Sequence, residues 1–498
     1  MNYMGIDIGT SGCKAVVFNE KGQQLAAANR EYDILFSNDG GAELDPDEVI
    51  EKCFSIIKEC CGQVPPASVK GLGISSQGEA FTAIGSENKS LCNAMVSSDT
   101  RSLPYIKKWS KEFGEEKLYR ITGHTAHSMF SLFKLLWLKE NRPEVWANTQ
   151  KFLCFEDLLQ LRLGLNPCLG WSLAGRTMLF DVIKHEWNDE ILSAVGLSSD
   201  QLATPLPSGT IAGKIAPQLA RDLGLAKGAF VVCGGHDQPC AAYGAGATRS
   251  GMAMYATGTV ECITPAMQES IFSKDLMASN LCTYDHALNG MYVTVAFSLT
   301  GGNILKWFRD EFGWQEIDEA KRSGVNVYEK ILQLIGNQPS RLLVLPYFTP
   351  SGTPYFDTKT KGAVFGLQLS TSRGEFLRAL LEGVTFEMRL NLEILEKSGY
   401  EIDELRIVGG GAQSPIWMQL KADIMGKRLK TLAVTEAGCL GVAMLACAAD
   451  LAISPGELAE IWVQPVSEIN PQENNREIYD KKFVQYKDLF SHVKKIAV

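Results

Sequence analysis

The segment "NYMGIDIGTSGCKAVVFNEKGQQLAAANREY" (residues 2–32) has the pattern of two or three antiparallel strands joined by tight turns. Apolar and polar residues alternate along it, and glycines stand where the chain must reverse its direction. A similar pattern returns in "GMAMYATGTVECITP" (251–265), where a strand, a turn of Gly and Thr, and a second strand follow one another. This repetition suggests that the chain consists of two halves of related design.

Helical and extended segments alternate through both halves. "LDPDEVIEKCFSIIKECC" (44–61) predicts a helix with a proline in its first turn. In the second half we expect a long helix over residues 373–397, begun by a Ser–Glu capping box. "ELRIVGGGAQSPIWMQLKADIMG" (404–426) predicts a strand, a glycine loop and a helix. This alternation indicates an α/β protein.

The length of 498 residues exceeds what one ordinary hydrophobic core holds, which favours two or three domains. We expect a boundary near residue 246, which divides the chain into domains 1–246 and 247–498. No Pro- or Ser-rich linker marks this position, so the boundary rests on the repeated pattern alone.

The composition is that of an ordinary globular enzyme, with 45% hydrophobic and 21% charged residues. The net charge of −9 and the lack of a dense basic run argue against nucleic acid or a membrane as partner. Thirteen scattered cysteines indicate reduced thiols in a cytoplasm. Asp7 interrupts the apolar stretch near the N-terminus, so no secretory signal is expected. The apolar run 438–449 is too short to span a bilayer and predicts a buried helix.

The segment "CGGHDQPCAAYGAG" (233–246) allows two interpretations. Cys233, His236 and Cys240 could form part of a metal site, or the loop could present Asp237 to a substrate. Structural zinc usually has four ligands in paired spacings, and the sequence has no second pair nearby. The catalytic-loop interpretation is therefore favoured.

Three glycine-rich turns follow strands in positions suited to a phosphate group. The first is Asp-Ile-Gly-Thr-Ser-Gly (7–12), the second is Thr-Gly-Thr (257–259), and the third is Gly-Gly-Gly (409–411) before a helix. Such turns expose backbone N–H groups with no bulky side chain in the way, and a helix N-terminus favours negative charge. Together they favour a nucleotide held between two domains.

Two further segments resemble signatures of the FGGY family of carbohydrate kinases. "MFSLFKLLWLKEN" (129–141) matches one signature, with Lys134 and Trp137 in place. "GAVFGLQLSTSRGEFLRALLE" (362–382) matches the second, through Gly362, Gly366, Glu375 and Glu382. The resemblance covers nearly the whole chain, and the two signatures stand in the family's order.

The resemblance implies a fold and an activity. Each domain is expected to have a ribonuclease-H-like core of the actin-like ATPase type, with ATP and a sugar meeting in the cleft between the two domains. The N-terminal domain is expected to bind the sugar and to carry the catalytic aspartate, and the C-terminal domain to bind the nucleotide. The implied reaction transfers the γ-phosphate of ATP to a hydroxyl group.

Roles follow by the same resemblance. Asp237 matches the general base, and Asp7 matches the aspartate that works with Mg²⁺, largely through water. The residues expected to contact the nucleotide are Gly9, Thr10, Ser11, Thr257, Gly258, Thr259, Gly301, Gly302, Gly410, Gly411 and Gln413. The residues expected to contact the sugar are Gln77, Glu79, Asp99, Arg101, Asp237 and Gln238.

The substrate is less specified than the reaction. Gln77 and Asp99 agree with xylulokinases, which commonly have Gln-Met-His and Trp-x-Asp at these places, whereas Glu79 and Gln238 agree with glycerol kinases. For Glu79 and Arg101 an ordinary ion pair remains an equal alternative. A ketopentose such as xylulose is the favoured substrate, with glycerol, another polyol or a sugar acid as alternatives.

Other protein classes remain as competing hypotheses. A non-catalytic sugar- or nucleotide-binding regulator would keep the cleft, but the intact Asp7 and Asp237 argue against it. An actin-like filament or chaperone ATPase is disfavoured by the carbohydrate-kinase signatures. A homodimer is possible, although no residue of the sequence demonstrates one.

Overall fold

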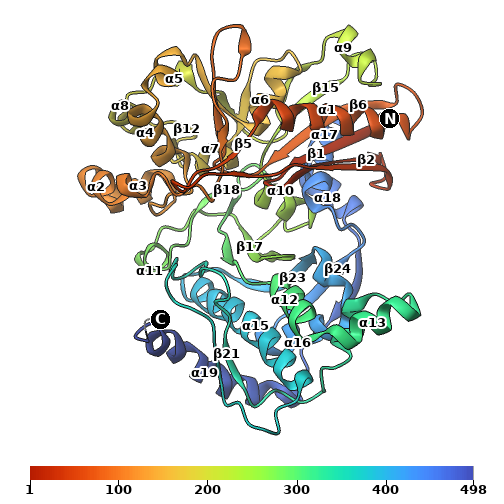
Figure 1. Cartoon of the computed structure of the whole chain (residues 1–498). Coiled ribbons are helices and arrows are strands. Elements are labelled where there is room, and N and C mark those ends of the chain that lie inside the picture. The colour runs from red at the N-terminus through yellow and green to blue at the C-terminus, as the bar shows by residue number, and fades with distance from the viewer. Residues whose placement is uncertain (497–498) are drawn as a thin grey trace.

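The computed structural model describes residues 1–496, which form two lobes, one above the other in Figure 1. The upper lobe contains the first half of the chain, and the lower lobe contains most of the second half. Each lobe is built around one mixed β-sheet with helices packed against it.

The sheet of the upper lobe has the strand order β14-β15-β6-β1-β2-β3. Strands β1, β2 and β3 form an antiparallel meander, and β6 and β15 extend the sheet in parallel with β1. The bounds are β1 (Asn2–Ile8), β2 (Gly12–Asn19), β3 (Gln24–Glu31), β6 (Val69–Ser76), β14 (Ile211–Lys214) and β15 (Phe230–His236). The strands expected in residues 2–32 are confirmed.

The sheet of the lower lobe repeats this arrangement. Strand β16 pairs antiparallel with β17 and parallel with β23, which in turn pairs parallel with β24. Both β1 and β16 shift register after their first residue against the parallel neighbour. The strands, in sheet order, are β18 (Tyr284–Asp285), β19 (Tyr292–Val293), β17 (Glu261–Met267), β16 (Gly251–Thr257), β23 (Ile402–Val408), β24 (Arg428–Leu432) and β25 (Pro465–Ile469), with β20 (Ala296–Ser298) beside β17. The repetition seen in the sequence is therefore a repetition of topology.

Smaller sheets and most helices surround these two. A five-stranded sheet of the upper lobe has the order β4 (Leu35–Phe36), β5 (Ala42–Leu44), β8 (Ala94–Met95), β7 (Phe81–Ile84) and β9 (Lys151–Cys154). Two-stranded pairs are β10 (Cys168–Gly170) with β13 (Thr204–Leu206), β11 (Phe180–Asp181) with β12 (Glu186–Trp187), and β21 (Leu343–Leu345) with β22 (Ala363–Phe365).

The helices of the first half are α1 (Pro46–Gly62), α2 (Leu103–Phe113), α3 (Glu115–Thr122), α4 (Ser131–Asn141), α5 (Pro143–Asn148), α6 (Phe155–Arg162), α7 (Trp171–Arg176), α8 (Asp189–Val195), α9 (Pro217–Asp222) and α10 (Asp237–Gly244). Those of the second half are α11 (Lys274–Ala278), α12 (Gly302–Phe312), α13 (Trp314–Ser323), α14 (Val327–Leu332), α15 (Arg373–Lys397), α16 (Pro415–Met425), α17 (Ala437–Leu451), α18 (Pro455–Trp462) and α19 (Arg476–Val493). No helix within residues 1–496 is both long enough and apolar enough to cross a membrane.

The expected helix starts are found in the structure. The carboxylate of Asp45 accepts hydrogen bonds from two backbone N–H groups of the first turn of α1. Ser372 and Ser414 cap α15 and α16 in the same way. Each of these caps satisfies backbone donors that the helix itself leaves unpaired.

Helices α10 and α17 pack closely against each other; α17 lies on the sheet of the other half, and α10 contacts the sheets of both halves. Helix α17 lies on β1 and β6 of the upper lobe, although the sequence places it in the second half (Figure 1). A Cβ atom at Gly5 would lie 1.8 Å from the carbonyl oxygen of Cys439, and one at Gly441 would lie 2.1 Å from that of Cys240. Glycines thus permit this close packing. The expected boundary at residue 246 separates the two sheets, but α17 and the β1 sheet share one core.

Candidate active site

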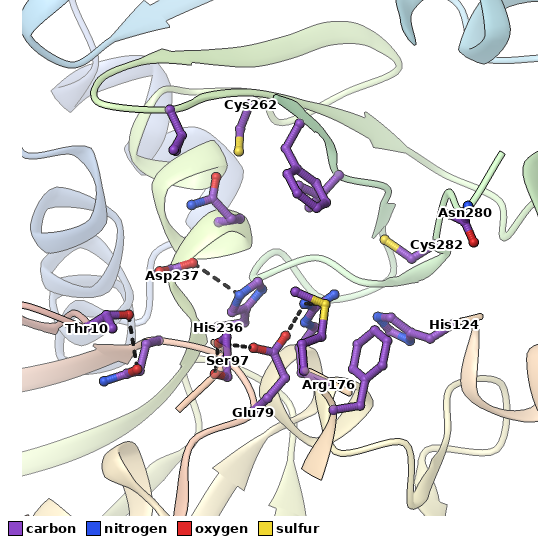
Figure 2. Close-up of a pocket in the computed structure, with 18 of the residues that line it drawn as sticks. Thr10, Glu79, Ser97, His124, Arg176, His236, Asp237, Cys262, Asn280 and Cys282 are labelled. Atoms are coloured by element: carbon purple, nitrogen blue, oxygen red, sulfur yellow. Dashed lines mark hydrogen bonds and ion pairs between the residues drawn. The ribbon is translucent and has the colours of Figure 1, made fainter. Parts of the chain in front are cut away.

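A cavity of about 270 Å³ opens between the two lobes. This volume is near the lower limit for small-molecule sites, so the cavity suits a small compound. Figure 2 shows that polar side chains of the upper lobe line one side and mostly apolar side chains of the lower lobe line the other. The lining residues of the upper lobe are Thr10, Gln77, Gly78, Glu79, Ser97, His124, Thr125, Met129, Phe130, Arg176, His236, Asp237 and Gln238.

Asp237 lies where β15 ends and α10 begins, at the base of this cavity. Its side chain remains 31% exposed, so the carboxylate can be reached from the cavity. Its Oδ1 atom makes no hydrogen bond with any residue of the described chain. Burial, followed by the negative charges of Asp7 and Glu79, raises the pKa of Asp237 to about 7. This is the value expected of a general base working near neutral pH.

His236 precedes Asp237 and lies beside its carboxylate. The Nε2 atom of His236 is 3.1 Å from Oδ1 of Asp237, and the Nδ1 atom is 2.9 Å from the hydroxyl of Tyr284. The backbone N–H of His236 donates to Oγ of Ser172 at 3.1 Å. Burial, with smaller contributions from Arg176 and His124, lowers the pKa of His236 well below its usual value. The imidazole is therefore neutral.

Glu79 and Arg176 form an ion pair in the floor of the cavity (Figure 2). Ser97 donates to Oε2 of Glu79 at 2.7 Å, and the guanidinium of Arg176 lies 4.8 Å from the ring centre of Phe130. Glu79 has a φ of +65°, a conformation that non-glycine residues rarely adopt. A neighbouring group must therefore hold its backbone in place.

Lys134, from the first signature, is that group. Its Nζ is fully buried and donates to the carbonyl oxygens of Glu79, at 3.2 Å, and Met95, at 3.3 Å. Ser131 donates to the same carbonyl of Glu79 at 2.9 Å. Burial lowers the pKa of Lys134 to about 8. The signature lysine thus supports the loop from beneath and does not line the cavity.

Gln77 connects the cavity to the first glycine turn. Its Nε2 donates to the carbonyl of Gly9 at 3.0 Å, and its Oε1 accepts from the hydroxyl of Thr10 at 3.1 Å. Asp7, two residues before Gly9, accepts a hydrogen bond from Ser75 at 2.8 Å. Burial raises the pKa of Asp7. The first turn and the expected sugar loop therefore form one hydrogen-bonded unit.

Asp99 and Arg101 do not line the cavity, in contrast to the other residues expected to contact the sugar. They form a buried ion pair at 2.7 Å, and Arg101 also pairs with Glu43 and stacks 4.1 Å above the ring of Trp137. Asp99 further accepts from the backbone N–H of Ala42. The structure thus favours the ion-pair alternative for Arg101: the carboxylate and guanidinium satisfy one another behind the cavity wall.

Of the four segments expected at the nucleotide, 9–11 lies in the upper lobe, and the other three (257–259, 301–302 and 410–413) meet in the lower lobe. Gly302 donates its backbone N–H to the carbonyl of Gly258 at 2.8 Å, and Asn303 donates its backbone N–H to the carbonyl of Thr259 at 3.3 Å. A Cβ atom at Gly411 would lie 2.7 Å from the hydroxyl oxygen of Thr257, so the third loop closely approaches the second. A Cβ at Gly410 would meet nothing within 4 Å. Gln413 ends the short helical turn Gly410–Gln413 just before α16.

Several lining residues were not expected from the sequence. His124 and Arg176 come from the first half of the chain. The mostly apolar wall comes from the second half: Val260, Cys262, Asn280, Cys282, Val295, Phe297 and Phe356. No local sequence motif predicted these lining residues, because each lies in a segment with the ordinary pattern of a helix, strand or loop. Arg176, the last residue of the short helix α7, became recognisable only through its contact with Glu79.

The thiols of residues 233–246 have other neighbours than His236. Cys233 is fully buried and donates to Oε1 of Glu156 at 3.3 Å, whereas His236 contacts Tyr284. Within residues 1–496 no group of three or more His, Cys, Asp or Glu side chains is arranged to hold a metal ion.

The chain is similar to known proteins over its two domains and over its whole length. The N-terminal domain model of the FGGY family of carbohydrate kinases matches residues 2–244, and the C-terminal domain model matches residues 253–449. Xylulose kinase of Bacillus subtilis (strain 168) is 28% identical over 498 residues, covering 99% of this chain and 98% of the relative. Gluconokinase of Bacillus licheniformis is 26% identical over 483 residues, covering 96% and 93%. The crystal structure of a "xyloylose kinase" from Brucella ovis is 26% identical, covers 100% of both chains and superposes with a TM-score of 0.89.

Proposed function

Because the chain belongs to the FGGY family of carbohydrate kinases, we propose that it phosphorylates a ketopentose such as xylulose, with Asp237 as general base. Its fold is the two-domain actin-like ATPase fold, and it is an ATP-dependent phosphotransferase with an alcohol group as acceptor. The observation that carries the proposal is the position of Asp237: a reachable carboxylate at the base of a small polar cavity between the lobes.

The proposed reaction requires no covalent intermediate with the protein. Phosphoryl transfer depends on alignment, on neutralisation of charge, and on a carboxylate that accepts the hydroxyl proton. With its ionised carboxylate facing the cavity, Asp237 would take the proton of the sugar hydroxyl as that oxygen attacks the γ-phosphorus. Enclosure of the cavity by both lobes would exclude water, which would otherwise compete as acceptor.

The nucleotide would lie across the glycine turns. Backbone N–H groups of Thr10, Ser11 and Thr259 would contact its phosphates, since those of Gly9 and Gly258 donate within their own turns. Gly301, Gly302, Gly410, Gly411 and Gln413 would leave room for the rest of the molecule. Asp7 fits a Mg²⁺ site of the expected kind, because Mg²⁺ prefers oxygen ligands and retains several waters. A Cβ at Gly438 would lie 3.3 Å from Cγ of Asp7, so α17 begins directly beside this carboxylate. When bound, Mg²⁺ would neutralise phosphate charge.

The substrate proposal rests on the size and polarity of the cavity. Gln77, Glu79 and Gln238 offer oxygen and nitrogen atoms suited to several hydroxyl groups. The names of the relatives include both xylulose kinase and gluconokinase, so a sugar acid is the second candidate. Arg176 favours that candidate in one respect, since its Nε makes no hydrogen bond within the described chain.

The decisive experiment pairs one variant with a substrate panel. ADP release would be measured with xylulose, other ketoses, glycerol, other polyols and gluconate. We expect xylulose to give the highest kcat/KM. The D237N variant should lose turnover by about 10²–10⁴-fold, the usual contribution of a general base, while ATP affinity measured by calorimetry stays unchanged.

Each outcome has a separate meaning. Full activity of D237N would reject Asp237 as the base. Greater activity on gluconate or glycerol would leave the base in place and replace the ketopentose. Sugar binding without any sugar-stimulated ADP release would favour a non-catalytic regulator.

A further inference from the structure

A segment of the second half, residues 280–285, is docked on the upper lobe next to the candidate base. The N–H of Thr283 donates to the carbonyl of Gly123 at 2.9 Å, and the hydroxyl of Tyr119 donates to the carbonyl of Leu281 at 3.0 Å. Asp285 lies 2.9 Å from Nε2 of His185. These contacts fix the backbone on both sides of Tyr284.

Tyr284 is fully buried, and its hydroxyl hydrogen needs an acceptor. Burial raises the pKa of Tyr284 well above its usual value, so the phenol keeps its proton. Within residues 1–496 its one hydrogen-bond partner is Nδ1 of His236, at 2.9 Å. Because a phenol O–H must donate here or remain unsatisfied, Nδ1 is the acceptor.

This assignment determines the position of the other ring proton. A neutral imidazole carries one proton, so when Nδ1 accepts, Nε2 bears the hydrogen. That N–H lies 3.1 Å from Oδ1 of Asp237 (Figure 2), although the two atoms are not yet aligned for a hydrogen bond. The terminal torsion of an aspartate is soft, so rotation of the carboxylate can align them.

We propose that Tyr284 and His236 are positioning residues for Asp237: the Tyr284 hydroxyl holds His236 in the Nε2–H tautomer, which orients and stabilises the ionised carboxylate. The proposal rests on the proposed function, since it assumes that Asp237 acts as the base. By this proposal a residue of the second half, Tyr284, helps to orient Asp237 of the first half.

The charges around Asp237 explain why such a donor matters. Asp7 from β1 and Glu79 after β6 both disfavour the ionised carboxylate, whereas Arg176 from α7 and Gln238 from α10 favour it. His124 faces His236 but is itself neutral, because burial lowers its pKa well below the usual value. An N–H donor from His236 therefore opposes the repulsion of two carboxylates.

The kinetic test compares two buried tyrosines: Tyr284, which lies within residues 280–285, and Tyr119, which donates a hydrogen bond to that segment. We expect Y284F to lower kcat at pH 7 by up to about tenfold, because without the Tyr284 hydroxyl His236 no longer reliably keeps its N–H toward the charged carboxylate of Asp237. The KM for the sugar should change little, and the acid limb of the pH–rate profile should move to higher pH. Y119F is the matched control, because it removes a tyrosine hydrogen bond to residue 281 without touching His236.

A second test observes the tautomer without any turnover. The full chain contains six histidines, so ¹⁵N-histidine labelling gives few imidazole signals, and H236Q identifies that of His236. The wild type should show a proton on Nε2 and a bare Nδ1 from pH 6 to 9. Y284F should show a mixture of tautomers. H236Q should keep more activity than H236A, because a glutamine amide also supplies an N–H donor.

The outcomes separate this proposal from the one on which it rests. A wild-type proton on Nδ1, or an acid limb that Y284F leaves in place, would overturn the positioning role even if D237N is inactive. An equal loss in Y119F and Y284F would reduce Tyr284 to a structural contact. Full activity of D237N would instead overturn the base itself.

Discussion

Asp237 gains its chemical character from the groups around it. An aspartate normally titrates far below neutral pH, but burial and the charges of Asp7 and Glu79 bring the pKa of Asp237 to about 7. The same environment that makes the carboxylate a better proton acceptor also makes it harder to ionise. At neutral pH the two forms of the residue are therefore present in similar amounts.

This balance predicts the pH dependence of the reaction. With Asp237 as the proposed base, its ionised carboxylate is the active form, so kcat/KM for the sugar should fall about tenfold per pH unit below pH 7 and level off above it. The measurement is kcat/KM from pH 5.5 to 9 at saturating ATP. A profile that stays flat to pH 5.5 would show that the group accepting the proton is not a carboxylate of raised pKa.

At the scale of elements, the close packing of α10 against α17 connects the two halves of the chain. Gly441 of α17 lies so close to α10 that an added Cβ would be 2.1 Å from the carbonyl oxygen of Cys240. Backbone cannot yield as a flexible side chain can, so either helix would have to move. Because α10 begins with Asp237 and α17 begins beside Asp7, such a movement would also reach the site.

We therefore expect G441A to destabilise the protein by about 1–3 kcal/mol, as overpacking of a core usually does. Its thermal unfolding midpoint should fall by about 1–3 °C, because an unfolding entropy of about 2.1 cal/mol/K per residue gives roughly 1 °C per kcal/mol for a chain of 498 residues that unfolds as one unit. G456A in α18 is the control, because the nearest atom to its Cβ is the hydroxyl oxygen of Ser454 at 3.8 Å. Equal midpoints for G441A and the wild type would mean that the helices separate at little cost.

At the scale of the molecule, the two lobes are similar units joined by helices that contact the sheet of the other half. The first sheet is covered by α17 from residues 437–451, and the lower-lobe sheet is contacted by α10 from the first half. Residues 280–285 add a further connection from the second half to the upper lobe. The cavity draws its two walls from both halves, so neither half contains the whole site.

A fragment of residues 1–246 should therefore not fold as an independent domain. Without α17, the face of β1 and β6 that this helix covers would be exposed to water, together with its apolar core. Expressed alone, the fragment should aggregate or unfold without a cooperative transition in circular dichroism, unlike the full chain. A fragment with a sharp transition near that of the full chain would contradict this expectation.

The sequence by itself determined the α/β class, the two related halves, the main helix starts and the family. These features depend on local patterns: alternation along strands, caps at Asp45, Ser372 and Ser414, and the two signature segments. It also gave Asp237 as the candidate base, because the Gly-Gly-x-Asp segment around it resembles that of the family.

Only the tertiary structure decided which side chains share the cavity. Asp99 and Arg101 satisfy one another behind its wall, while Arg176 lines it. Tyr284 contacts His236 from a segment distant in sequence. The return of α17 to the first sheet was equally invisible in the linear pattern. The physical reason is that burial, ion pairing and hydrogen bonding depend on distances in space, which the chain sets only when both halves have packed together.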